Sequence, residues 1–430
     1  MPIPSHLISP ETGRTFPLDD VRLLAYGDPA TRVRGFPVNL EPLYPDGAFT
    51  VAAFRDAFAR RRGLWDFHAL LPVDGATEPV TLGEGNTPLL PVPTPHGTLL
   101  LKDESRNATW SHKDRAMTVA VTVAKAMGFR TVVGASTGNA GAALAAYAAR
   151  AGLRCIMFTG TDVPRTMQTL MAAYGALLCL VEGGSNRRAL ASIGIERYGW
   201  YPGTNVTDPP VGANTYGIEG YTTIAYEIVR DLGDAPAAVV VPTSYGDNVT
   251  GIWRGFQRMH AAGMITRLPR MIVAEPANAA PYEAAITSDG PRTVSATPTA
   301  AFSIGGSTAS RQGWQTVRAS GGTAVVVAEE DILRTQVTFA GETGLYLEAA
   351  SIVGVHVARR IAAETDGAVV VIATSSGLKD PMATAHALPI PPTIPVDAGA
   401  LEVALRETYS VDPVLLVEDR RAEESAFPVG

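Results

Sequence analysis

Residues 237–249 read AAVVVPTSYGDNV, a continuous run of small and β-branched residues that ends in a polar turn containing glycine. β-Branched residues favour strands, and an uninterrupted apolar run predicts a strand that is buried on both faces. The turn residues after it predict a loop at the carboxyl end of that strand. Because strands covered by helices on both faces are typical of parallel sheets, the stretch indicates an α/β fold.

The same alternation of strand-like and helical segments continues on both sides of this stretch. Strand-like runs occur at 98–104 (TLLLKDE), 129–136 (FRTVVGAS), 153–160 (LRCIMFTG) and 367–377 (GAVVVIATSSG). Helical patterns lie between them, for example at 114–128, 217–232 and 344–363. These units are too many for one ordinary sheet, so the sequence predicts two parallel-sheet α/β domains.

The two ends of the chain differ from this pattern. Residues 1–75 carry scattered aromatic residues, prolines and glycines, and predict an N-terminal subdomain. Residues 386–395 (HALPIPPTIP) predict an extended proline-rich linker, which leads into a C-terminal tail ending at residue 430.

The composition limits the class of protein. A chain of 430 residues with 46% hydrophobic residues can bury a core, and 35 basic against 42 acidic residues argue against nucleic acid as a partner. No apolar run is long enough to span a membrane, and the start lacks a secretory signal pattern, so we expect a soluble, cytoplasmic protein. The 2 cysteines, Cys155 and Cys179, lie in apolar runs and are expected to be buried, reduced thiols.

Polar residues follow several of the predicted strands. Lys113 lies in KDESRNATWSHKDR (102–115) at the start of a helix, where the helix dipole disfavours its protonation and makes it a candidate Schiff-base lysine. The segments ASTGNA (135–140) and PTSYGDNV (242–249) suit anion binding by backbone N–H groups. Each signal alone also fits a surface lysine or an ordinary helix start. Together with the strand end at 374–376 they predict one shared pocket.

These motifs resemble threonine synthases. TLGEGNTPLL (81–90), the segment around Lys113, STGNA, VVVPTSYGDN (239–248) and TSSGLKDP (374–381) occur in the order and spacing of that family, over roughly residues 5–385. The resemblance implies the tryptophan synthase β-like fold, type II of the pyridoxal-phosphate (PLP) enzymes. It implies a large PLP-binding domain of residues 76–114 and 206–385, and a smaller mobile domain of residues 115–205.

The resemblance also implies roles for individual residues. Lys113 matches the lysine that holds PLP, Asn139 the asparagine at the ring hydroxyl, and Thr374 the hydroxyl that faces the pyridine nitrogen. The matching loop for the substrate carboxylate is Ser136, Thr137, Gly138 and Asn139. The matching loop for the cofactor phosphate is Ser244, Tyr245, Gly246, Asp247 and Asn248, with the Asp247 carboxylate expected to point away.

Several positions depart from the family pattern. Gly217 stands where threonine synthases carry the arginine that grips the substrate phosphate. Three other arginines are candidates to replace it: Arg187, Arg188 and Arg311.

Further departures lie near the lysine and at the N-terminus. Trp110 replaces a glycine, and His112 replaces a phenylalanine, for which a repacked wall is favoured over a titrating group. Ser9 and Thr12 stand where many relatives have cysteines of a zinc element, so no metal is expected there.

The reaction implied is β-elimination or β/γ-replacement on a small L-amino acid, through an aminoacrylate-like intermediate. Threonine synthase proper, acting on O-phosphohomoserine, is the runner-up, and a non-catalytic PLP-binding or amino-acid-binding regulatory protein is the alternative from another class. The segment EGYTT (219–223) also resembles diaminopropionate ammonia-lyases. The family implies a homodimer; neither nucleic acid nor membrane is expected as a partner.

Overall fold

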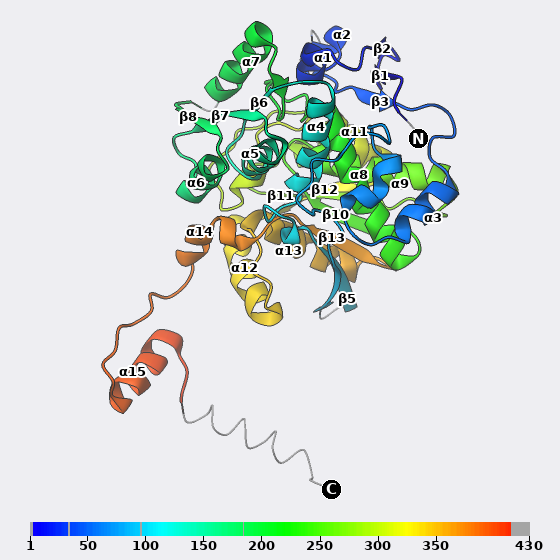
Figure 1. Cartoon of the computed structure of the whole chain (residues 1–430). Helices are drawn as coiled ribbons and strands as arrows, with labels where there is room; N and C mark the ends of the chain where they lie inside the picture. Colours follow the sequence, from blue (N-terminus) through cyan, green and yellow to red (C-terminus); the bar gives the residue numbers. More distant parts are fainter. Residues whose placement is uncertain (1–2, 33–34, 95–96, 184, 414–430) are drawn as a thin grey trace. The chain divides into compact units, whose positions relative to one another are not determined.

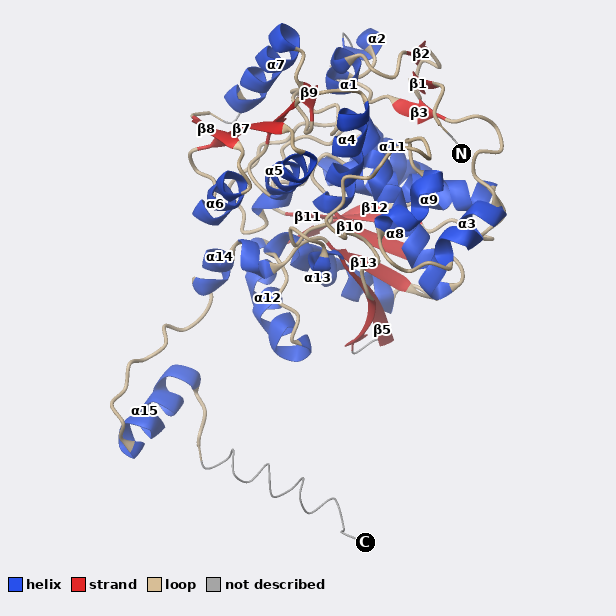
Figure 2. Cartoon of the chain, in the orientation of Figure 1, coloured by secondary structure: helices blue, strands red, loops and turns tan. Residues whose placement is uncertain are grey.

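The computed structural model describes residues 3–32, 35–94, 97–183 and 185–413. The chain divides into two compact units, residues 1–380 and residues 381–430. Three sheets lie in the first unit (Figures 1 and 2). The mixed α/β architecture with parallel strands confirms the predicted fold class, whereas the domain boundaries given above stay a prediction.

The larger sheet has six strands in the order β12-β11-β10-β13-β5-β4. All neighbouring pairs are parallel except β4 with β5. The central strand β10 comes from the apolar run at 237–241, and each of its residues is buried. The strands are β4 (Leu89–Thr94), β5 (Gly97–Asp103), β10 (Ala238–Pro242), β11 (Arg270–Pro276), β12 (Thr323–Val327) and β13 (Val369–Ala373).

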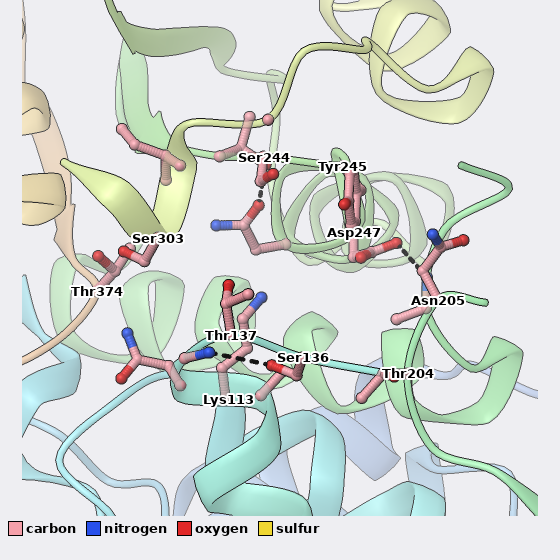
Figure 3. A pocket seen from close by; sticks show the side chains of 18 of the residues that line it. Lys113, Ser136, Thr137, Thr204, Asn205, Ser244, Tyr245, Asp247, Ser303 and Thr374 are labelled. Carbon is pink, nitrogen blue, oxygen red and sulfur yellow. Dashed lines mark hydrogen bonds between the residues drawn. The ribbon is translucent and has the colours of Figure 1, made fainter. Parts of the chain in front are cut away.

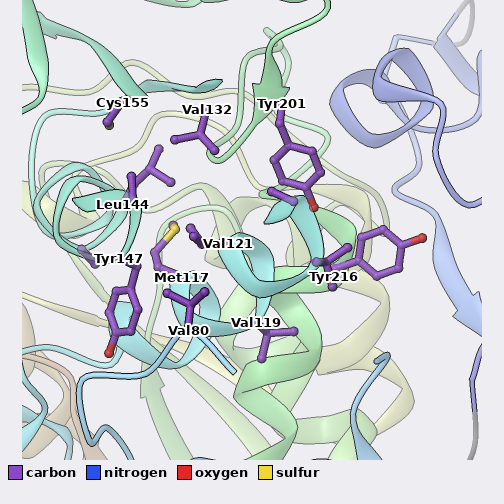
Figure 4. Packing of buried hydrophobic residues seen from close by; sticks show 14 of the residues in the cluster. Val80, Met117, Val119, Val121, Val132, Leu144, Tyr147, Cys155, Tyr201 and Tyr216 are labelled. Atoms are coloured by element: carbon purple, nitrogen blue, oxygen red, sulfur yellow. The ribbon is translucent and has the colours of Figure 1, made fainter. Parts of the chain in front are cut away.

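The smaller sheet has four parallel strands in the order β8-β7-β6-β9. Its core includes Val132, Leu144 and Cys155 (Figure 4). The prediction of two buried thiols is wrong for Cys179, which is exposed because β8 is an edge strand with little cover. The strands are β6 (Thr131–Ala135), β7 (Arg154–Gly160), β8 (Leu177–Val181) and β9 (Tyr201–Pro202).

Helices cover both sheets and begin where the strand-end loops finish. The helix expected over 344–363 starts later, after Glu348, because residues 344–348 turn out of helical geometry at Gly344. The helices of this part are α4 (Lys113–Ala126), α5 (Asn139–Ala151), α6 (Arg165–Ala173), α7 (Asn186–Tyr198), α8 (Thr215–Leu232), α9 (Asp247–Ala261), α10 (Pro281–Thr287), α11 (Arg311–Ala319), α12 (Glu329–Thr343) and α13 (Ala349–Ala363).

The N-terminal segment forms a small antiparallel sheet of its own, in the order β2-β1-β3. At its turn, the Ser9 hydroxyl accepts from the Thr12 N–H, and the Thr12 hydroxyl donates to Asp28. The elements are β1 (His6–Ile8), β2 (Thr15–Phe16), β3 (Glu41–Leu43), α1 (Val21–Tyr26), α2 (Pro29–Arg32) and α3 (Val51–Phe58). Among the described residues, no group of acidic, histidine or cysteine side chains is arranged to hold a metal.

A buried ionic network joins α4, α8 and β5. The Arg115 guanidinium donates to Glu104 at 2.7 and 2.8 Å and to Glu227 at 2.7 and 2.8 Å. Lys102 on β5 donates to Glu227 at 2.6 Å. Since charges this deep need partners on every side, the network holds the start of α4 against α8.

The second unit contains α14 (Pro381–Ala385) and α15 (Ala398–Tyr409), joined by the proline-rich segment. No helix in the described ranges of the chain has the length and apolar character needed to cross a bilayer.

Candidate active site

One cavity collects the loops that follow β6, β10 and β13 and the start of α4 (Figure 3). All the predicted site residues except Gly246 line it: Lys113, Ser136, Thr137, Gly138, Asn139, Ser244, Tyr245, Asp247, Asn248 and Thr374. The loops after β10 and β13 meet because parallel strands end at the same edge of a sheet, and the loop after β6, from the smaller sheet, lines the same cavity. Their roles remain predictions, but the tertiary structure brings them together.

Lys113 is the first residue of α4, and its side chain points into the cavity, which Thr137 also lines (Figure 3). Its Nζ lies 5.6 Å from the centroid of the Tyr221 ring. Burial lowers the pKa of Lys113, while the carboxylates of Asp247 and Glu348 oppose that shift. The neutral amine is therefore more accessible at physiological pH than that of a solvated lysine.

Asp114, the second residue of α4, holds the loop that precedes the helix. Its carboxylate accepts from the Thr109 N–H at 2.6 Å and from the Thr109 hydroxyl. Burial raises the pKa of Asp114 to about 7.

The loop before α5 offers backbone N–H groups and an amide side chain. The Ser136 hydroxyl accepts from the N–H groups of Gly138 and Gly141 at 3.3 and 3.0 Å. Asn139 donates through Nδ2 to Glu348 at 2.8 Å, so its amide is oriented by a carboxylate. Glu348 was not predicted as a site residue; the signal was a lone acid in the apolar run GLYLEAASIV.

The loop before α9 has a backbone geometry that needs glycine. Gly246 has a φ of 78°, and a Cβ there would lie 2.6 Å from the Gly313 Cα. A Cβ at Gly306 would lie 2.6 Å from the Ser244 Oγ, so the backbone at Gly306 lies close to the Ser244 side chain. The Gly246 and Val249 N–H groups donate to the Thr243 hydroxyl and to Asn248 Oδ1. Because Gly246 has no side chain to cap α9, the N–H groups of Asp247 and Asn248 between them are left for an anion.

Asp247, the first residue of α9, is buried and turned partly away from that loop. Its Oδ1 accepts from the Ala213 N–H at 2.8 Å and from Gln312 Nε2 at 2.7 Å. Burial raises the pKa of Asp247, and Lys113 opposes the shift. The Asp247 carboxylate therefore binds the segment before α8, although Asp247 itself is part of the anion loop.

His112 and Thr374 form the opposite wall. The Thr374 hydroxyl lies 2.9 Å from the Ser351 hydroxyl, and the Thr374 carbonyl lies 3.0 Å from His112 Nδ1. The imidazole packs on Tyr221 with ring centroids 5.5 Å apart, and burial holds the pKa of His112 well below its usual range. A neutral, packed ring supports a repacked wall over a titrating group. Trp110, where the resemblance implies a glycine, has a φ of 60°.

The three candidate arginines differ in whether they pair with an acid and in whether they line the cavity. Arg188 pairs with Asp208, and Arg311 pairs with Glu11. Arg187, in the first turn of α7, lines the cavity.

Gly217 is not among the described residues that line the cavity, and a Cβ there would lie 3.2 Å from the Ala116 carbonyl oxygen on α4. At the position where the resemblance implies an arginine, α8 therefore packs closely against α4.

The residues present fit PLP. The cavity offers a lysine amine with a lowered pKa, an uncapped helix start for a phosphate, and a hydroxyl at a strand end for a ring nitrogen. The family described as pyridoxal-phosphate dependent enzyme matches residues 80–375. The chain belongs to that family.

Curated relatives of this PLP-dependent enzyme include threonine synthases. The one from Mycobacterium leprae (strain TN) is 34% identical over 340 residues, covering 77% of this chain and 92% of that one. The one from Synechocystis sp. is 34% identical over 335 residues, covering 75% and 84%. The one from Methanocaldococcus jannaschii is 32% identical over 369 residues, covering 81% and 88%. Family and relatives together make the chain a PLP-dependent lyase.

Solved structures support the fold. Maize serine racemase matches with a TM-score of 0.59 at 16% identity, covering 88% of this chain and 100% of that one. Processed threonine deaminase isoform 2 from Solanum lycopersicum matches with a TM-score of 0.56 at 20% identity, covering 67% and 82%. Both likenesses place this enzyme among the type II PLP folds.

Proposed function

We propose that this PLP-dependent lyase acts on a small L-amino acid by β-elimination or by β- or γ-replacement. The observation that carries the proposal is the position of Lys113, which shares one cavity with two anion-binding helix starts and a strand-end hydroxyl. A bound cofactor with a phosphate and a substrate with a carboxylate need two separate anion sites. The starts of α9 and α5 supply one each.

The side chains divide the work as follows. Lys113 would hold the cofactor through Nζ, and its amine, when free, would take the α-proton of the substrate as general base. When bound, PLP supplies an electron sink for the negative charge left on the α-carbon. The N–H groups at the start of α5 would hold the substrate carboxylate, and the neutral Thr374 hydroxyl would hold the ring nitrogen.

Replacing Lys113 tests the proposal. Lys113→Ala is expected to abolish turnover and the visible absorption band of the lysine-bound cofactor. Lys125→Ala, at the exposed end of the same helix, is the matched control and is expected to keep both. A Lys113→Ala protein with an unchanged spectrum and full turnover would contradict the assignment.

Threonine synthase proper is a second candidate. Its support is the sequence similarity to threonine synthases and the presence of Arg187 in the cavity despite the glycine at 217. Release of inorganic phosphate and threonine from O-phosphohomoserine would establish it, and inertness toward that compound would exclude it. Amino-acid binding without conversion of any amino acid would instead favour a regulatory protein.

A further inference from the structure

The cavity contains a positive charge that the roles assigned so far leave unused. Arg187 lines it, its Nε is buried without a hydrogen-bond partner, and the part of the chain that the structure describes gives its guanidinium no ion pair. A guanidinium is a cation with five N–H donors and no acceptor, so it can bind only an acceptor group. A charged group left with an unsatisfied buried nitrogen is suited to receive a ligand.

Three other polar side chains of the cavity have partners of their own. Asp247 is the acid among the described residues that line the cavity, and its Oδ1 accepts from the Ala213 N–H and from Gln312 Nε2. The Asn205 amide donates to the Thr207 carbonyl, and the Thr204 hydroxyl accepts from the Ala135 N–H. Their polar atoms serve the local backbone, which leaves Arg187 for a group that arrives from outside.

The two other anion sites lie on different elements. The start of α5 is matched to the substrate carboxylate and the start of α9 to the cofactor phosphate, whereas Arg187 projects from α7. The cavity would hold one cofactor and one amino acid, and their phosphate and carboxylate already have an anion site each. A third anion site would therefore face the side chain of the substrate.

We propose that Arg187 is the specificity-determining residue for a negatively charged group on the substrate side chain, a phosphoryl or a carboxyl group. The assignment rests on the proposed function and moves the anion site from the family position, Gly217 on α8, to α7. A guanidinium offers two parallel N–H donors to such a group, which an ammonium does not.

The test measures amino-acid binding to the PLP-loaded enzyme by titration of its cofactor absorption spectrum. Two matched pairs of ligands differ by one phosphoryl group: O-phospho-L-homoserine with L-homoserine, and O-phospho-L-serine with L-serine. O-Succinyl-L-homoserine provides the carboxylate arm. Arg187→Gln is expected to weaken binding of the charged ligands by roughly 10- to 100-fold and to change that of the neutral ones by less than about threefold.

Two further variants sharpen the result. Arg187→Lys keeps the charge without the fork and is expected to recover only part of the affinity. Arg197→Gln, on the exposed face of the same helix, should bind all ligands like the wild type. A wild-type enzyme with no preference for charged ligands, or an Arg187→Gln enzyme that loses both kinds equally or neither, would overturn the assignment.

Turnover, followed in parallel, separates this assignment from the proposed function. If charged ligands bind in an Arg187-dependent way and no amino acid is converted, the proposed function fails and the role of Arg187 stands. If neutral amino acids are converted and charge has no effect on binding, the role of Arg187 fails alone.

Discussion

At the scale of single residues, the anion loop depends on a glycine for two reasons that can be separated. Gly246 and Gly233 both have positive φ, 78° and 86°, but only at Gly246 would a Cβ meet another backbone segment. Gly233→Ala is expected to cost about 1–2 kcal/mol of unfolding free energy from strain alone. Gly246→Ala should cost about 1–3 kcal/mol more and weaken PLP binding. Urea unfolding and PLP titration check both values, and equal costs would show that crowding is unimportant.

At the scale of elements, the buried network around Glu227 holds α4 and α8 together. Glu227→Gln leaves Lys102 and Arg115 short of one negative charge, and is expected to cost about 3–5 kcal/mol at pH 7. Glu364→Gln, in an exposed pair with Arg360, should change stability by less than about 0.5 kcal/mol.

The same network predicts a dependence on pH. The Arg115 and Lys102 charges hold the pKa of Glu227 below its usual value of 4.5 in spite of burial. A lowered folded-state pKa stabilises the protein above the unfolded value, and that contribution is lost as the pH falls. The difference in unfolding free energy between wild type and Glu227→Gln, measured by urea unfolding, should therefore become smaller below about pH 4.5. A gap that stays constant down to acid pH would show that Glu227 acts by packing alone.

At the scale of the whole molecule, every candidate site residue belongs to the unit of residues 1–380. A chain ending at residue 385 is therefore expected to bind PLP with an affinity within twofold of the full chain. Its thermal midpoint should lie within about 2 °C, because a compact unit keeps its own core. PLP titration and calorimetry measure both, and a shortened chain that fails to bind PLP would show that the tail completes the site.

The expected homodimer would appear as a doubled mass in light scattering.

Much of this architecture was predictable from the sequence, because apolar runs and polar loops indicate strands and helix starts locally. The apolar runs at 237–241 and 369–373 are buried strands of one parallel sheet, as predicted, since only strands covered on both faces tolerate such runs. Lys113 and Asn139 stand out for a similar reason: each opens a helix directly after a polar loop. The exposure of Cys179 was missed, because an edge strand and a buried strand can carry the same apolar sequence.

The sequence by itself determined the order of strands and helices, the loops at the strand ends and the lysine at the start of α4, because each depends on neighbours within a few residues. Only the tertiary structure decided which charges meet in the cavity. It places the Glu348 carboxylate within hydrogen-bond distance of the Asn139 amide, and that of Asp247 within reach of the Ala213 N–H. It pairs Arg188 and Arg311 with acids, while Arg187 has no ion pair among the described residues. Electrostatic partners are set by distances in space between residues far apart in the chain, and no local pattern encodes those distances.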